Sequence, residues 1–152
     1  MRPRVLFEAG FETGEGPVWD ARLACLHCVD STNPALWTFN ADGTVLDRIA
    51  LPQCIGFAVL TNDPNRLVVG LEDGLYILDR KGRSLEKRLD PEPGVTSNRI
   101  NDGVVDHDGS LVFGTLHRSY TKPDGAMYHL SVSGELTQFD SGYIVSNSPF
   151  PH

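Results

Sequence analysis

The 152-residue sequence lacks several features that mark large classes of protein. No run of apolar residues approaches the roughly 18 that a membrane-spanning helix needs, so we expect no membrane partner. Lys and Arg number 13 against 20 Asp and Glu, which leaves a net charge of −7 and no dense basic cluster. Because nucleic-acid-binding proteins normally carry a basic patch, we expect no nucleic-acid partner either.

Cysteine is scarce, and its odd count of three prevents complete pairing. Cys25 and Cys28 form a CxxC motif, but their neighbours favour a β-strand, in which residues three apart point to opposite faces. A structural zinc site would need a turn there and a second ligand pair. We therefore expect free thiols. No apolar leader segment follows Arg2 and Arg4, and together these signs predict a cytoplasmic protein.

Amphipathic helices are also missing, and 15 glycines and 10 prolines separate short apolar runs instead. Three similar units recur, at 35–49, 74–89 and 125–139, and each combines an aromatic strand, a turn with one glycine and an alternating strand. The same place in each unit is taken by an aromatic residue: Trp37, Tyr76 and Tyr128. A second hairpin precedes each unit, beginning at Gly16, Gly56 and Gly103. Four strands in about 40 to 50 residues are typical of a β-propeller blade.

These repeats predict an all-β fold, a partial β-propeller domain over residues 1–152. The expected blades span about 16–50, 56–90 and 102–140, and a fourth would begin at 143–152. Propellers close with about four to eight blades, and closure protects the strand edges. Three blades would leave unpaired faces, so we expect a homodimer or a companion chain to complete the ring.

The segment SNRINDGVVDHDGSLVFGTL, at 97–116, is rich in acids and amides. It does not match the ligand spacing of an EF-hand loop in any register. Asp106, His107 and Asp108 fit a hairpin turn. The preceding NRIND is predicted to be a loop at the central mouth of the ring, where Arg99 and Asn101 could enter the channel; an ordinary Asx-turn is the alternative.

Two other blades offer oxygen donors at the matching place. Glu15 stands between two glycines before the first blade, and Asn147 follows the third. Taken alone, each could be an ordinary loop residue. Together, Glu15, Asn101 and Asn147 form a set of hard oxygen donors, which suits Ca²⁺, Mg²⁺ or Mn²⁺ better than structural zinc. The histidines show no metal-binding spacing and no GxSxG motif is present, but His117 ends a strand near the mouth and could meet a substrate.

The motifs GEGPVWD, LEDGLYILD, NRINDGVVDHDGSLVFGTL, GAMYHL and VSN, in this order, resemble the gluconolactonase/regucalcin (senescence marker protein) family, in its N-terminal half. The resemblance implies a six-bladed β-propeller that hydrolyses sugar lactones with a divalent cation in its channel. The cation would be Ca²⁺, Zn²⁺, Mn²⁺ or Mg²⁺, with Ca²⁺ or Mn²⁺ favoured. The expected partner is therefore a small sugar lactone.

The resemblance also implies roles for individual residues. Glu15 and Asn147 would bind the metal, with Asn101 as a further candidate ligand. Arg99 and Asn101 would contact the hydroxyls of the substrate, and Asp102 would brace their loop. The aspartate that usually serves the family as third ligand and general base has no counterpart here, so no catalytic residue is assigned and the half-length chain could be inactive alone.

Two alternatives to a lactonase stay open at this point. The chain could be a non-enzymatic propeller fragment that assembles with another chain. It could also keep the metal and hydrolyse other esters, such as aryl esters or phosphotriesters. Neither composition nor motif spacing separates these three functions.

Overall fold

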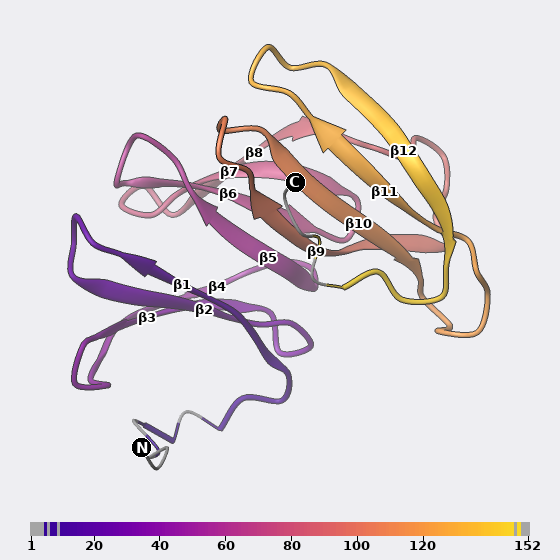
Figure 1. The fold of residues 1–152 in the computed structure, drawn as a ribbon. Helices are drawn as coiled ribbons and strands as arrows, with labels where there is room; N and C mark the ends of the chain where they lie inside the picture. The colour runs from indigo at the N-terminus through magenta and orange to yellow at the C-terminus, as the bar shows by residue number, and fades with distance from the viewer. Residues whose placement is uncertain (1–4, 6, 9, 148, 150–152) are drawn as a thin grey trace, which may run out of the picture.

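The computed structural model describes residues 5, 7, 8, 10–147 and 149. Within these residues the chain forms twelve strands and no helix (Figure 1). Their bounds are β1 Gly14–Asp20, β2 Cys25–Asp30, β3 Ala35–Asn40, β4 Val45–Ala50, β5 Ile55–Leu60, β6 Arg66–Leu71, β7 Gly74–Asp79, β8 Ser84–Leu89, β9 Asn98–Val105, β10 Leu111–His117, β11 Gly125–Leu130 and β12 Leu136–Tyr143. The described part of the chain therefore offers no helix of the length and hydropathy needed to cross a membrane.

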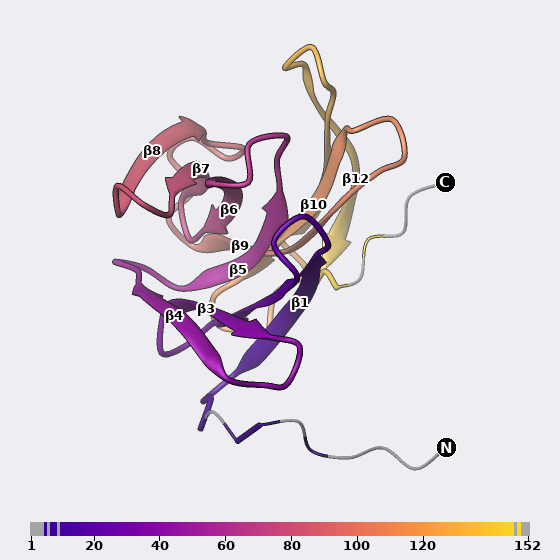
Figure 2. The same ribbon diagram turned by 90° about the vertical axis from the view of Figure 1, so that its left-hand side faces the viewer.

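The strands form three antiparallel four-stranded sheets, each made of consecutive strands: β1–β4, β5–β8 and β9–β12. Figure 2 shows β1, β5 and β9 gathered toward the middle of the arrangement, with β4, β8 and β12 farther out. This confirms the predicted all-β fold and makes the chain a partial propeller. The predicted start of a fourth blade, 143–152, falls partly on residues 148 and 150–152, which lie outside the described residues.

Apolar side chains between neighbouring sheets hold the blades together. One buried cluster joins the first two sheets and includes Val29, Leu36, Ile55 and Leu67. A second joins the second and third sheets and includes Phe57, Ile100, Leu111 and Phe113. The middle sheet therefore buries apolar residues on both faces, and its first two strands, β5 and β6, read as the nearly continuous apolar runs IGFAVL and RLVVGL.

The turns follow the chemistry that the sequence predicted for them. Asp106 and Ser110 close the hairpin between β9 and β10, where the Asp106 amide donates to the Ser110 carbonyl at 2.8 Å. Gly109 completes this turn with a φ of 88°, which is open to glycine at no steric cost. The acidic DHDG segment is thus a hairpin turn, as predicted.

Each of the three first strands carries a β-bulge near its beginning. The register shifts between Glu15 and Val18 in β1, between Ile55 and Phe57 in β5, and opposite Gly114 and Thr115 in β9. The residues that the shifts leave out of register are Gly16 and Pro17, Gly56, and Asn101. Bulges bend a strand and re-aim its side chains, so the three strands share one distortion at the same level of the fold.

The CxxC motif lies within β2, where both Cys25 and Cys28 are buried and free, as predicted. His27 stands between them and is fully buried. Its Nδ1 lies 2.9 Å from the Thr38 hydroxyl, and its Nε2 lies 3.6 Å from the Cys25 sulfur. Burial lowers the pKa of His27 to about 4, and the positive charge of Arg80 contributes to the decrease.

His27 makes the stability of the fold depend on pH. The unfolded chain, with a histidine pKa of 6.5, binds the proton more readily than the native state, whose pKa is about 4. The contribution of His27 to the free energy of unfolding is therefore fully present above pH 6.5. It is lost as the pH decreases toward 4 and below, by up to about 3 kcal/mol. We expect His27→Gln to flatten this dependence in urea unfolding series. His107→Gln, in an exposed turn, should leave it unchanged, and equal slopes for both variants would contradict the assignment.

Gly56 sets the distance between β5 and β9. A Cβ at this position would lie 2.2 Å from the backbone oxygen of Asn101 and 2.6 Å from its backbone carbon. Because both atoms belong to the main chain, Gly56→Ala must displace one strand, and we expect it to cost about 1–3 kcal/mol of unfolding free energy. Gly82→Ala is the matched control, since its Cβ would meet only the Asp79 side chain, at 3.2 Å. Equal denaturation midpoints for both variants would refute this packing constraint.

Candidate functional site at the mouth of the first strands

The bulge in β9 places Asn101 at the centre of the candidate site. Asn101 falls between Asp102, which pairs with Gly114, and Ile100, which pairs with Thr115. Its side chain is consequently released from the regular alternation of the strand. The sequence had predicted a loop here, and that was wrong: Arg99 and Asn101 lie within β9, and Glu15 lies within β1. Because hydrogen bonds between strands hold the backbone at these positions, the Cα atoms that carry these side chains are fixed in place.

The orientation of the Asn101 amide follows from its neighbours. Its Nδ2 donates to the Ser146 carbonyl at 2.6 Å and to Asn147 Oδ1 at 2.9 Å, and its Oδ1 accepts from Arg99 Nη1 at 3.1 Å. A carbonyl only accepts and a guanidinium only donates, so the reversed amide would leave both contacts unsatisfied. Asn101 is buried, which makes such a reversal costly. It therefore ties Arg99 to Asn147 in one defined geometry.

Arg99 is held from β9 and from the β10–β11 connection. Nη1 donates to the backbone oxygen of Ile100 at 2.9 Å as well as to Asn101, and Nη2 donates to the Tyr120 hydroxyl at 2.9 Å. These contacts engage three of the five N–H donors of the guanidinium. The remaining donors could meet an oxygen-rich ligand at the mouth.

Glu15 approaches this group from β1, across the mouth. Burial raises the pKa of its carboxyl, the negative charge of Asp102 raises it further, and the positive charge of Arg99 opposes both. These interactions show that Glu15, Asp102 and Arg99 share one electrostatic environment although they belong to different sheets. The structure thus brings together Glu15 and the residues of β9 that the sequence singled out.

Asn147 reaches the site because the segment after β12 crosses the third sheet. This segment passes over Gly114, whose missing Cβ would lie 2.5 Å from Ser146 Cβ and 2.4 Å from Ser146 Oγ. The close approach carries the Ser146 carbonyl and the Asn147 side chain to Asn101. Sequence reasoning named Asn147 but missed Ser146 and Gly114, since no local pattern links residues so far apart.

The oxygen donors at the mouth provide part of a site for the divalent cation that the family resemblance implies. Among the described residues, no group of three or more His, Cys, Asp or Glu side chains is placed to hold a metal ion. Of the three expected ligands, Glu15 offers its carboxylate, and Asn147 offers Oδ1, which accepts one hydrogen bond and keeps a second lone pair. The Asn101 oxygen faces the Arg99 guanidinium instead. The chemistry of this pair fits part of a hard-cation site.

His117, which the sequence placed near the mouth, is engaged in a local turn. Its Nδ1 accepts from the Ser119 amide at 3.1 Å and lies 2.7 Å from the Ser119 hydroxyl. Because the amide can only donate, Nδ1 is the unprotonated nitrogen of the ring. His117 therefore shapes the connection between β10 and β11, which carries Tyr120.

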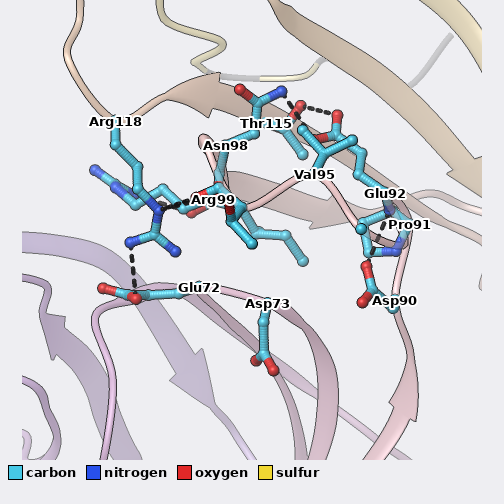
Figure 3. Close-up of a pocket in the computed structure, with 13 residues that line it drawn as sticks. Glu72, Asp73, Asp90, Pro91, Glu92, Val95, Asn98, Arg99, Thr115 and Arg118 are labelled. Carbon is cyan, nitrogen blue, oxygen red and sulfur yellow. Dashed lines mark hydrogen bonds and ion pairs between the residues drawn. The ribbon is translucent and has the colours of Figure 1, made fainter.

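A small pocket of about 160 Å³ adjoins the mouth between the second and third sheets (Figure 3). Arg118 forms an ion pair with Glu72 at 2.8 Å on one side of it. On the other side, Glu92 accepts hydrogen bonds from Asn98 and from Thr115, at 2.9 and 2.7 Å. These interactions fasten the β8–β9 connection to the third sheet and so fix where β9 begins, immediately before Arg99.

Comparison with known proteins agrees with this architecture. An L-arabinolactonase from Azospirillum brasilense is 33% identical over 120 residues, which are 78% of this chain and 40% of that protein. A 6-deoxy-6-sulfogluconolactonase from Pseudomonas putida is 27% identical over 134 residues, 88% of this chain and 46% of that protein. The crystal structure of regucalcin, a calcium-binding protein from Agrobacterium tumefaciens, superposes with a TM-score of 0.85 at 26% identity, covering 93% of this chain and 48% of that one.

The chain thus spans about half the length of the curated relatives that it matches. The family model described as SMP-30/Gluconolactonase/LRE-like region matches residues 13–150. This match includes all twelve strands and every residue of the candidate site. The chain therefore belongs to the SMP-30/gluconolactonase/LRE-like family.

Proposed function

We propose that this chain contributes the Arg99–Asn101–Asn147 side of the active site of a metal-dependent sugar lactonase. The observation that carries the proposal is the buried Asn101 amide, which joins Arg99 to Asn147 on the same mouth as Glu15. The names of the relatives support lactones as the substrate class. The free cysteines support a reducing, cytoplasmic location as part of the same proposal.

Arg99 is the proposed anchor for the substrate. Lactone hydrolysis turns a neutral ring ester into a carboxylate, so negative charge develops on oxygen during the reaction. A guanidinium that is already oriented by Asn101 and Tyr120 can donate to such oxygens without reorganising. Asn101 acts in the proposal as the residue that orients Arg99 and Asn147.

Glu15 and Asn147 are the proposed metal ligands, because they supply hard oxygens at this mouth. Hard donors favour Ca²⁺ or Mn²⁺ over a structural zinc. A bound cation would polarise the lactone carbonyl and lower the pKa of a bound water. It would also relieve the repulsion from Asp102, which adds to the effect of burial in raising the pKa of Glu15.

Assembly with further blades is a second candidate function, and the outer sheets favour it. Trp19 in the first sheet and Phe139 in the third are large apolar residues that are 47% and 56% exposed. Exposed apolar side chains on the first and last sheets suit contacts with a second copy or a companion chain. A companion chain of different sequence would also be a source of the general base, whereas a second copy would repeat the residues of this chain.

Glu15→Gln tests the proposed metal ligand. The substitution keeps the size of the side chain and removes its charge, so we expect Mn²⁺ or Ca²⁺ affinity and aldonolactone turnover to fall by roughly tenfold or more. Calorimetric titration of the metal and a pH-stat assay measure the two effects. Glu135→Gln, in an exposed turn, is the control.

Undiminished metal affinity in Glu15→Gln would remove Glu15 from the site. A panel of aldonolactones and aryl esters, assayed in parallel, separates a lactonase from a general esterase. Binding of metal with no turnover, together with a dimer in light scattering, would favour the assembly function.

A further inference from the structure

Tyr120 adopts a backbone conformation that bulky residues seldom occupy. Its φ is 57°, in the left-handed region, and the residue is 51% exposed. The two other non-glycine residues with positive φ among those described, Ala24 and Arg83, each end a short hairpin turn, where such a residue is common. Tyr120 lies instead in the longer β10–β11 connection, 118–124, which has more room to avoid strain. Strained backbone conformations of this kind occur mainly at functional sites, where they hold a side chain in a required orientation.

The turn around Tyr120 is held by hydrogen bonds on both sides. The Tyr120 amide donates to the His117 carbonyl at 2.8 Å. Ser119 donates its amide to His117 Nδ1 at 3.1 Å, and its hydroxyl lies 2.6 Å from the Thr121 hydroxyl. His117 itself is buried in β10. The hydrogen bonds to His117 therefore anchor the backbone of Tyr120 to the third sheet.

The Tyr120 hydroxyl meets Arg99 at the mouth. Arg99 Nη2 donates to this oxygen at 2.9 Å, and the guanidinium carbon lies 5.8 Å from the ring centroid. Because a guanidinium can only donate, the phenol oxygen must act as the acceptor in this contact. The phenol hydrogen is then directed away from Arg99 and can be donated to another acceptor.

We propose that Tyr120 is a further substrate-binding residue of this site, which donates its hydroxyl proton to a ring hydroxyl of the sugar while accepting from Arg99. This assignment rests on the proposed lactonase function and deepens it. A tyrosine and an arginine joined in this way present adjacent donors, which match neighbouring oxygens of a polyhydroxylated ring. An aryl ester without hydroxyls lacks the ring hydroxyls that Tyr120 would contact, so the residue favours sugars.

Tyr120→Phe isolates the hydroxyl, since it keeps the ring and the turn. The ligand is 1,5-anhydroglucitol, a stable cyclic polyol that lacks the reactive carbonyl, and its affinity is measured by calorimetry. We expect the substitution to weaken binding about five- to tenfold, the usual effect of one hydrogen bond. The matched control is Tyr76→Phe, which removes a hydroxyl bonded to Asp73 at 2.9 Å in the second sheet and should bind like the wild type.

Two readouts separate the outcomes. In hydrolysis assays, Tyr120→Phe should raise KM for aldonolactones by a larger factor than KM for aryl esters, whereas a purely structural defect would impair both substrates equally and reduce the melting temperature. Wild-type affinity for the polyol in Tyr120→Phe overturns the assignment while leaving the lactonase proposal intact. A wild-type protein that binds neither polyol nor lactone overturns the proposed function and this assignment with it.

Discussion

The close approach of β5 to β9 is the constraint on which the rest of the site depends. Gly56 lies against the Asn101 carbonyl with no room for a Cβ, and both residues are at the bulges of their strands. This contact sets the depth of Asn101 relative to the neighbouring blade. From that position its amide reaches Ser146 and Asn147 on one side and Arg99 on the other.

Burial gives this network its precision. A buried amide that lost its partners would cost about 1–3 kcal/mol, so the arrangement in which every partner is satisfied is strongly preferred. The same reasoning applies at Glu92, whose carboxylate accepts from Asn98, Thr115 and Tyr128. Burial, together with that carboxylate, raises the pKa of the Tyr128 hydroxyl, which therefore stays a donor. Polar groups between blades thus place β9 as firmly as the apolar clusters do.

The mouth combines charges of both signs in a protein of net charge −7. Glu15 and Asp102 repel one another, and Arg99 attracts Glu15. An arrangement with two acids and one guanidinium suits a ligand that combines a cation with oxygen-rich groups. The geometry joins these charges from two sheets, so their combination is a property of the propeller arrangement and not of any single blade.

Most of the fold and part of the site follow from local patterns. Alternating apolar residues, turn glycines such as Gly109 and the repeated aromatic positions determine strands and hairpins, because these depend only on neighbouring residues. GEGPVWD and NRIND likewise identified Glu15, Arg99 and Asn101 through their likeness to a family.

What local patterns left open is how these residues meet. The expected loop at NRIND is a bulged strand, and β1 carries a bulge near its beginning as well. In β1 the sequence held a signal for it, because Gly16–Pro17 is a pair that strands tolerate at bulges. The orientation of Asn101 and the bond from Arg99 to Tyr120 needed partners from distant segments of the chain. The sequence by itself determined the blades and the candidate residues; only the tertiary structure decided which atoms face one another, because hydrogen-bond partners distant in sequence are set by packing between elements.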